Sequence, residues 1–535
     1  MNQSTSHKLF RATKQFSELV SKYQENDASV AKYISGFPSI ENFKKQIAAK
    51  QNVNINRNLL ADELLLQYKT IEDKKRTLTQ IENLRNNNTF TVTTGHQCSL
   101  FTGPLYFIFK IISAINLAKE LQAKIPGNNF VPVFWMATED HDFAEINHIN
   151  LLNKKIEYNS SELGNAVGRI ALNNIETTIS EIEEVIQNFE YGKTAIEILK
   201  KAYQSDNNIA TATRIFVHEL FKNDGLVILD ADSMALKSEF KNIIAKDISE
   251  NKNIDFVTSN TNHLIADGLI DKPQITPRSV NFFLLDNSKR LRIDRTTEST
   301  FTLKDSDEIY SNESLQELIQ SNPEMFSPNV VMRPMYQETI LPNLAYIGGG
   351  AEFIYWMQLK EMFVANNIIF PLLMLRNSAL ILEKNTLEKF LNLGFVVDDV
   401  FEQTLTLQKK YLKANTVEIS FDEELSTLKK IFSELKQKAI VVEKTLENTV
   451  EAEFVKTNAS IKNIEQKILK AQKRNEETSL LQIEKFKQKY FPNNELQERN
   501  DNFLYYFAKY GFDFLDYLKA ELNPIESKFV LTVLE

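Results

Sequence analysis

Glycine and proline are scarce in this chain of 535 residues, with 14 and 13 copies respectively. Each amounts to about 2.5% of the residues, against roughly 7% and 5% in an average protein. Because these two residues interrupt helices and strands more often than any others, their scarcity favours long uninterrupted elements, above all helices. At roughly 150 residues per domain, the length predicts two to four domains.

Cysteine occurs once, as Cys98. A single cysteine excludes an intramolecular disulfide and a zinc motif built from paired cysteines. The chain also begins without the apolar segment of a secretory signal, and no run approaches the ~20 apolar residues of a membrane span. We therefore expect a soluble, cytoplasmic protein in a reducing compartment, with no membrane partner.

An excess of positive charge is absent too. The 62 lysine and arginine residues stand against 71 aspartate and glutamate residues, which gives a net charge of −9. This balance disfavours a nucleic-acid partner, because nucleic-acid-binding proteins usually carry a basic surface. A local basic pocket is still compatible with it.

Apolar segments that alternate with helical patterns indicate an α/β protein. Residues 89–94 are β-branched, and residues 130–137 form a second apolar segment. Between them, after Pro104, apolar residues cover most of the circumference of a helix, as in a buried helix. Strand, helix and strand in this order predict a parallel sheet. Further strands are predicted at residues 226–229, 344–347 and 368–375.

These patterns divide the chain into four segments. They are an N-terminal helical region (1–88), a Rossmann-like α/β core (89–393), an α-helical coiled coil (394–492) and a C-terminal helical segment that packs on the core (493–535). Insertions are expected near residues 150–215 and 270–330. Within the second insertion, residues 282–285 and 290–293 are typical of a hairpin that turns at Asn287-Ser288.

The coiled coil is predicted from a stretch without glycine or proline between Gly394 and Pro492. Steps of three and four connect its apolar residues Leu425, Leu428, Phe432, Leu435, Ala439, Val442 and Leu446. Two steps of four then reach Val450 and Phe454, which indicates a stutter, before the pattern resumes as far as Ala471. Pairing within the chain and pairing with a second copy would both bury this seam.

Dense charge follows the second predicted strand, at Glu139, Asp140, His141 and Asp142. In an open parallel sheet, ligands bind beyond the carboxyl ends of the strands, so these side chains are candidate acids, bases or metal ligands. The alternative is a solvated strand end at which Asp140 or Asp142 caps the next helix. Charge this dense after a buried strand favours the functional interpretation.

Gly95, His96 and Gln97 should reach the same edge of the sheet. Glycine lets a ligand approach the backbone closely, and the helix that begins at Pro104 directs free amide groups at an anion. The pattern is neither a Walker A motif nor a dinucleotide-binding fingerprint, so an ordinary turn between strand and helix explains it equally well.

A second glycine run, Gly348, Gly349 and Gly350, follows the strand at 344–347 and precedes a helix that contains Glu352. Its position suits a nucleotide phosphate or ribose, although a plain tight turn is an equal alternative.

Three arginines, Arg278, Arg333 and Arg376, lie in or beside apolar stretches and therefore need a partner. A structural salt bridge is the commoner solution, and bidentate recognition of a carboxylate or phosphate is the more specific one. Ser378, two residues after Arg376, is a further candidate binding residue.

Two other sequence patterns indicate different kinds of catalytic site. His141, Glu145 and His148 are spaced to share one helical face, and with Asp142 they would suit a metal-dependent phosphohydrolase, although the order differs from that of zinc proteases. Cys98 lies two residues from His96 and could be a nucleophile, but an incidental buried cysteine is the simpler interpretation. We assign no metal site.

Five blocks of sequence together resemble the BshC family of bacillithiol biosynthesis, whose members are described as cysteine ligases. The first two read TGHQCSLFTGPLYFIFKIISAINLAKEL and VPVFWMATEDHDFAEINHI, and the others lie at residues 327–359, 371–382 and 489–511. The blocks follow one another in the order of the family and cover the chain from about residue 90 to its end. One departure is His96-Gln97, where many members carry Gln-Gln.

The resemblance implies a Rossmann-like core with connecting-peptide insertions and a long coiled coil that forms a homodimer. It also implies an amide bond between the carboxyl group of L-cysteine and the amine of glucosaminyl-malate, which gives the thiol bacillithiol. ATP, with Mg²⁺ as its counter-ion, is the expected activator, because a carboxylate condenses with an amine only after its oxygen becomes a leaving group.

Within this interpretation the candidate residues acquire roles. Asp140, His141 or Asp142 would accept the proton of the attacking amine, whereas Arg333 and Arg376 would hold the malate carboxylates. The nucleotide would bind at the sheet edge or near Tyr510-Gly511. A metal-dependent phosphohydrolase and a non-catalytic, nucleotide-binding coiled-coil adaptor stay as the alternatives.

Overall fold

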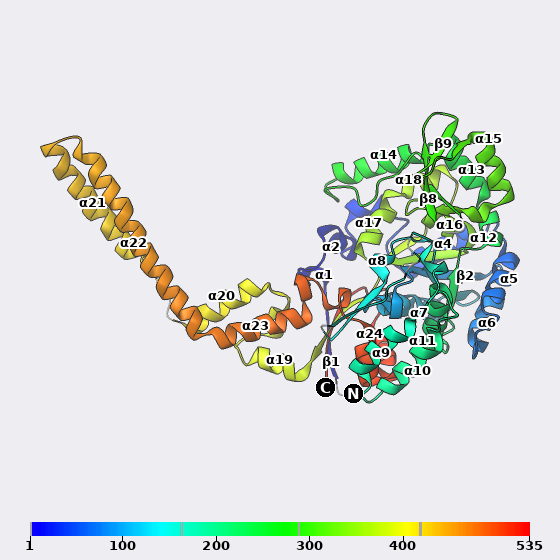
Figure 1. The fold of residues 1–535 in the computed structure, drawn as a ribbon, viewed down its shortest axis with the longest axis horizontal. Coiled ribbons are helices and arrows are strands. Elements are labelled where there is room, and N and C mark those ends of the chain that lie inside the picture. Colours follow the sequence, from blue (N-terminus) through cyan, green and yellow to red (C-terminus); the bar gives the residue numbers. More distant parts are fainter. Residues whose placement is uncertain (1–2, 153, 161, 163, 287–288, 417–419) are drawn as a thin grey trace. The chain divides into compact units, whose positions relative to one another are not determined.

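The computed structural model describes residues 3–152, 154–160, 162, 164–286, 289–416 and 420–535. The chain forms two compact units, one made of residues Met1–Ile381 with Leu496–Thr532, and the other of Leu382–Glu495 with Val533–Glu535. Figure 1 labels the elements of both units.

The first unit is built on a five-stranded sheet in which every pair of neighbours is parallel. Its strands are β2 (Thr89–Gln97), β3 (Asn129–Ala137), β6 (Val227–Asp230), β12 (Asn343–Gly348) and β13 (Leu372–Leu375). They lie in the order β13-β12-β2-β3-β6, so the winding reverses between β2 and β12. This is the order of a Rossmann-like fold, which confirms the predicted α/β class.

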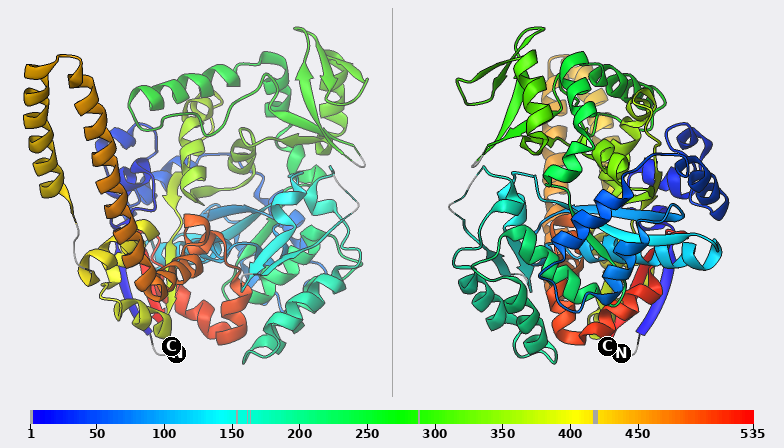
Figure 2. Two further views of the ribbon diagram at one scale, coloured as in Figure 1. Left: turned by 60° about the vertical axis from the view of Figure 1, so that its left-hand side comes forward. Right: turned by 90° about the vertical axis from the view of Figure 1, so that its right-hand side faces the viewer.

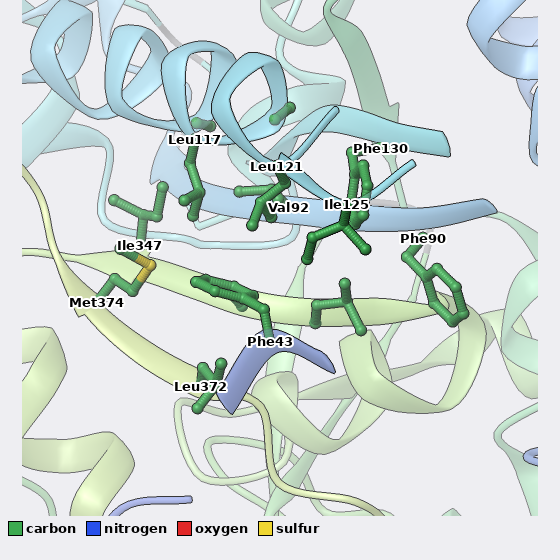
Figure 3. Packing of buried hydrophobic residues seen from close by; sticks show 14 of the residues in the cluster. Phe43, Phe90, Val92, Leu117, Leu121, Ile125, Phe130, Ile347, Leu372 and Met374 are labelled. Atoms are coloured by element: carbon green, nitrogen blue, oxygen red, sulfur yellow. The ribbon is translucent and has the colours of Figure 1, made fainter. Parts of the chain in front are cut away.

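The core lies where the crossover helix α7 (Tyr106–Lys124) covers the sheet. Leu117 and Leu121 of α7 pack with Val92 of β2 and Ile347 of β12, as Figure 3 shows. Phe43, from α4 (Ile40–Lys50), joins the same cluster. Full burial of such side chains stabilises the fold by about 2 kcal/mol each, which holds the carboxyl ends of the strands in fixed positions.

The first insertion lies between β3 and β6. It contains α8 (Phe143–Ile146), β4 (His148–Leu151), β5 (Lys154–Glu157), α9 (Ile175–Ile186), α10 (Gly192–Ala202) and α11 (Ile209–Phe221). The second lies between β6 and β12, and its helices are α12 (Met234–Ser238), α13 (Lys241–Glu250), α14 (Asn253–Ala266), α15 (Asn312–Ser321) and α16 (Arg333–Ile340).

The second insertion also carries an antiparallel sheet of its own, drawn in green in Figure 2. Its strands are β7 (Phe282–Leu285), β8 (Arg290–Arg295), β9 (Thr300–Leu303), β10 (Ile309–Ser311) and β11 (Phe326–Pro328). The predicted pairing of the segments at 282–285 and 290–293 is confirmed. The predicted turn at Asn287-Ser288 lies outside the described residues.

Helices occupy most of the N-terminal and C-terminal segments, as the sequence predicts. They are α1 (Phe10–Thr13), α2 (Glu18–Gln24), α3 (Ala28–Ala31), α4, α5 (Arg57–Gln67), α6 (Lys75–Asn83), α24 (Phe503–Tyr510) and α25 (Phe512–Glu521). Between β12 and β13 the core adds α17 (Gly350–Gln358) and α18 (Lys360–Ala365). The side chain of Asn116 on α7 donates to the carbonyls of Lys519 and Leu522, which ties α25 to the core.

Two terminal strands correct the purely helical prediction for these segments. β1 (Gln3–Lys8) and β15 (Phe529–Leu534) form a three-stranded sheet with β14 (Ser378–Glu383), in the order β1-β15-β14. The β1 segment, QSTSHK, has no apolar alternation, so its pairing depends on β15 and leaves no local signal.

The second unit is helical. It contains α19 (Lys384–Leu391), α20 (Thr404–Asn415), α21 (Asp422–Val442), α22 (Leu446–Asn475) and α23 (Glu477–Tyr490). Helices α21 and α22 lie side by side in Figures 1 and 2. No helix among the described residues has both the length and the apolar character that a membrane span requires.

The two halves of the coiled-coil seam pair within the chain, because α21 and α22 form an antiparallel hairpin. The rings of Phe432 and Phe454 lie 5.5 Å apart, and Lys436 pairs with Glu447 and Glu451 at 3.1 Å each. The single seam predicted through Val442 to Leu446 was therefore wrong at this point. The backbone becomes extended at Glu443, between the two helices, and the supposed stutter lies just beyond this reversal.

Candidate active site

A cavity of about 670 Å³ lies at the carboxyl ends of β2, β3 and β12, where the strand order reverses. Ligands bind at this switch point in open α/β sheets. The predicted residues that line it are Gly95, His96, Gln97, Glu139, Asp140, His141, Arg278, Arg333, Gly349, Gly350, Glu352 and Arg376. Asp142, Gly348 and Ser378 were predicted to belong to the site but do not line the cavity.

Glu352 lies at the centre of a buried hydrogen-bond network. Its carboxylate accepts from Lys110 Nζ at 2.6 Å, from the Tyr346 hydroxyl at 2.7 Å and from the Gly349 amide at 2.8 Å. Burial raises the pKa of this carboxyl, but Lys110 and the other donors outweigh it and lower the pKa to about 2. Lys110 also donates to the carbonyl of Gly95, so the network ties β2 to β12.

This network changes the interpretation of the second glycine run. The predicted ligand of Gly348, Gly349 and Gly350 was a phosphate or ribose, yet the amide of Gly349 already donates to a carboxylate of its own helix, Glu352. A Cβ at Gly348 would lie only 3.0 Å from that of Glu352, so glycine serves the close approach of α17 to β12. The N-terminus of α17 therefore holds an internal anion.

Arg376 forms a structural salt bridge, which is one of the two roles predicted for it from the sequence. Its Nη2 donates to Glu498 at 2.6 Å, and its Nη1 donates to the Ser378 hydroxyl and the Asn377 carbonyl at 2.9 Å each. Ser378 in turn donates to Glu498, whose side chain is fully buried. Both terminal nitrogens of Arg376 are thus committed to the fold, although its side chain forms part of the cavity wall.

Arg333 differs, because it has no carboxylate partner among the described residues. Its Nη1 donates to Gln337 at 3.0 Å, whereas its buried Nη2 has no hydrogen-bond partner in the described chain. The guanidinium lies 5.3–5.8 Å from the ring centroids of Tyr346, Trp356 and Trp135. A buried cation with an unused donor at a cavity wall is suited to an anionic ligand.

Two further arginines add positive charge at the cavity. Arg278, from the second insertion, and Arg499, near the C-terminus, both line it with exposed side chains that pair with no other described residue. Arg499 was missed from the sequence. Its only signal was its place in the C-terminal block, next to the buried Glu498.

The carboxylates of the acidic segment, Glu139, Asp140 and Asp142, have different roles. Asp140 accepts from Gln97 at 2.8 Å and from the His141 amide at 2.7 Å. Burial alone would raise its pKa, but the imidazole of His141, the Gln97 amide and the His141 backbone amide together hold the pKa of Asp140 well below its usual range, so it is a weak base. Glu139 is paired with Lys237 at 2.5 Å. Asp142 caps α8 through the amide of Glu145, which is its predicted structural alternative.

The proposed metal face is not formed. α8 ends at Ile146, and His148 begins β4, so His141, Glu145 and His148 do not share a helix. Over the described ranges, no group of three or more histidine, cysteine, aspartate or glutamate side chains is arranged to hold a metal ion. The correction follows from the alternating burial of residues 148–151, which is the pattern of a strand.

His96 and Cys98 lack the properties of catalytic groups. Burial lowers the pKa of His96 to about 4, which keeps the imidazole neutral near pH 7, and its Nε2 lies 3.3 Å from the Tyr106 hydroxyl. Cys98 is fully buried, and burial raises the pKa of its thiol, so the thiolate is suppressed.

Comparisons with known proteins agree with this architecture. Residues 6–377 match the family described as "Bacillithiol biosynthesis BshC, N-terminal Rossmann-like domain", and residues 379–534 match its "C-terminal coiled-coil domain". Relatives named "Putative cysteine ligase BshC" include proteins of Flavobacterium johnsoniae and Flavobacterium psychrophilum. They are 38% and 37% identical to this chain, over 97% and 96% of it and 98% and 96% of their own lengths. The chain therefore belongs to the BshC family of bacillithiol biosynthesis.

Proposed function

We propose that this protein is a ligase that joins L-cysteine to glucosaminyl-malate through an amide bond, with ATP as the activator. The single observation that carries the proposal is Arg333, whose buried Nη2 has no hydrogen-bond partner within the described protein. The exposed guanidinium groups of Arg278 and Arg499 lie at the same cavity. Three available cations match a substrate with two carboxylates, here the malate portion, and an anionic activator.

The donors of the cavity fit a phosphate-bearing activator only in part. Arg278 and Arg499 offer free donors to phosphate oxygens, whereas the Gly349 amide at the N-terminus of α17 is occupied by Glu352. ATP, with Mg²⁺ as its counter-ion, would supply a leaving group on the cysteine carboxyl. The arginine side of the cavity is therefore the place where we expect its phosphates.

The residues of the acidic segment would orient the amine. Asp140 is ionised and lines the cavity, so it can accept a hydrogen bond from the sugar amine and direct the nitrogen lone pair at the carboxyl carbon. The new C–N bond forms as the activated oxygen leaves with its electron pair, and one N–H proton passes to water. Asp142 does not act as the base, because its side chain caps α8.

The second unit supports a homodimer as part of the proposal. The hairpin covers its own seam only in part, because the seam residue Val442 and the neighbouring Ile431 and Val441 on α21 stay 81%, 50% and 87% exposed. An apolar surface of this kind on a long hairpin suits contact with a second copy. We place this biosynthetic reaction in the cytoplasm.

The test is mass spectrometry of the purified protein incubated with glucosaminyl-malate, L-cysteine and Mg-ATP, with ATP omitted from a control. The proposal expects bacillithiol only in the complete mixture. Binding of ATP without any product, at every substrate concentration, would instead favour the adaptor. Phosphate release that needs a metal but no cysteine would favour the phosphohydrolase.

The variants Asp140→Asn and His141→Ala test the site itself. Both side chains line the cavity and belong to no buried ion pair, so folding should be preserved while product formation is lost. Circular dichroism and thermal unfolding provide the folding control. Normal product formation in both variants would remove the acidic segment from the mechanism.

A further inference from the structure

Arg290 reaches the cavity from the inserted sheet and is fixed on four sides. Its Nε donates to the Ser327 hydroxyl at 3.0 Å, and its Nη2 donates to the carbonyl of Pro328 at 2.9 Å. The guanidinium lies 3.9 Å from the centroid of the Phe283 ring. The remaining terminal nitrogen, Nη1, lies 3.0 Å from Nδ1 of His141.

This last contact determines how the imidazole is protonated. A guanidinium has only donors, so it can hydrogen-bond to Nδ1 of His141 only when Nδ1 carries no proton. In the neutral imidazole the proton then resides on Nε2. A proton on Nδ1 would instead place two donors, one of them cationic, against each other at 3.0 Å.

Asp140 also faces Nδ1 of His141, but Arg290 lies closer to it. Its Oδ1 lies 3.6 Å from His141 Nδ1, which exceeds hydrogen-bond distance, and the same oxygen accepts from the backbone amide of His141 at 2.7 Å. Its Oδ2 accepts from Gln97 at 2.8 Å. The pair is therefore not an Asp–His dyad in which the carboxylate prepares Nε2 to act as a base.

We infer that Arg290 is a positioning residue that holds His141 as the Nε2–H tautomer, so that His141 presents a hydrogen-bond donor to the ligand in this cavity. The acceptor it would serve, under the ligase function proposed above, is the carboxyl oxygen of cysteine, on which negative charge develops as the amine attacks. This role opposes the one predicted from the sequence, in which His141 takes a proton from the amine.

Nitrogen-15 NMR of protein with labelled histidine tests the inference on the intact chain. The sequence has only six histidines, and His141→Gln identifies the signals of His141 by their loss. The wild type should show an unprotonated Nδ1 and a protonated Nε2 for His141 at neutral pH. A protonated Nδ1 with a free Nε2 would overturn the inference, whether or not ligation has been detected.

Two arginine variants separate the specific contact from a general effect of charge on β8. Arg290→Met should convert His141 to a mixture of tautomers and lower kcat at least tenfold, with a change of less than threefold in KM for glucosaminyl-malate. Arg292→Met removes a neighbouring arginine that pairs with Asp294 at 2.7 Å, and it should change neither tautomer nor kcat.

Arg290→Lys completes the design, because it keeps the charge but cannot maintain all the fixed contacts of a guanidinium. It should fold, retain tight substrate binding and show a kcat between those of the wild type and Arg290→Met. Unchanged tautomer and kcat in both Arg290 variants would show that the contact with His141 has no positioning role.

Discussion

Replacing Arg333 by methionine should weaken substrate binding far more than it weakens the fold. The change removes the guanidinium but keeps an unbranched apolar side chain against the rings of Trp135, Tyr346 and Trp356. Nη1 donates to Gln337, whereas Nη2 has no hydrogen-bond partner in the described chain. The donor that is lost is therefore one that the ligand, rather than the fold, would use.

The expected size of the effect follows from that single donor. A hydrogen bond between charged groups contributes about 1.5–3 kcal/mol, and each 1.4 kcal/mol is a factor of about ten. The Kd for glucosaminyl-malate should thus rise about 10- to 150-fold in Arg333→Met. The free energy of unfolding should fall by about 1.5 kcal/mol, the lower end of the same range, because the one bond lost joins the guanidinium to a neutral amide, Gln337.

Titration calorimetry measures the Kd, and urea unfolding measures the stability of the same samples. Arg57→Met is the matched control, since Arg57 is also partly buried, faces the ring of Phe90 and donates to the carbonyls of Leu84 and Thr89. It should lose stability without losing affinity. An Arg333→Met protein that binds glucosaminyl-malate within twofold of the wild type would refute the reasoning.

Three further predictions concern the buried network and the hairpin. Glu498→Gln should lower the free energy of unfolding in urea by about 3–5 kcal/mol, because Arg376 then stays buried without its counter-charge; an unchanged transition would contradict the buried pair. The Glu352 carboxyl has a pKa of about 2 in the fold against 4.5 when unperturbed, so its stabilisation is complete above pH 4.5 and is lost as the pH falls towards 2. The stability advantage of the wild type over Glu352→Gln should therefore shrink between pH 6 and pH 3, and a constant difference would show that the pKa is not lowered. Ile431→Lys combined with Val441→Lys should give monomers, because these exposed residues belong to the surface proposed for the second copy, and an unchanged dimer mass by sedimentation would contradict that surface.

The sequence predicted the sheet because its strands are continuous apolar segments. Residues 89–94 and 130–137 are buried almost throughout, and the polar residues that follow each strand meet at one edge because the strands are parallel. That geometry brings Gly95, His96 and Gln97 together with Asp140 without any need for a recognised motif.

Long-range pairing explains what the sequence did not predict. Arg376 is held by Glu498, 122 residues away, and no local pattern distinguishes such an arginine from Arg333, which has a free donor. Arg290 lies in a polar hairpin strand, and only the packing of the inserted sheet brings it to His141. Both assignments depend on contacts between segments that are distant in the chain.

The reversal of the coiled coil had no local signal either. It occurs at Glu443, without glycine or proline, after three β-branched residues, Ile440, Val441 and Val442. Such residues are only moderately unfavourable in a helix, and the apolar spacing continues across the turn by coincidence.

The amide bond is the central claim, and cysteine labelled with oxygen-18 at both carboxyl positions tests it most directly. The labelled cysteine is incubated with the protein, glucosaminyl-malate and Mg-ATP, and the mass of the thiol product is measured by mass spectrometry. The account predicts that the product keeps one of the two labelled oxygens, because the other leaves when the carboxyl carbon bonds to the amine. A product that keeps both would show that cysteine is attached through another atom, and would contradict the account.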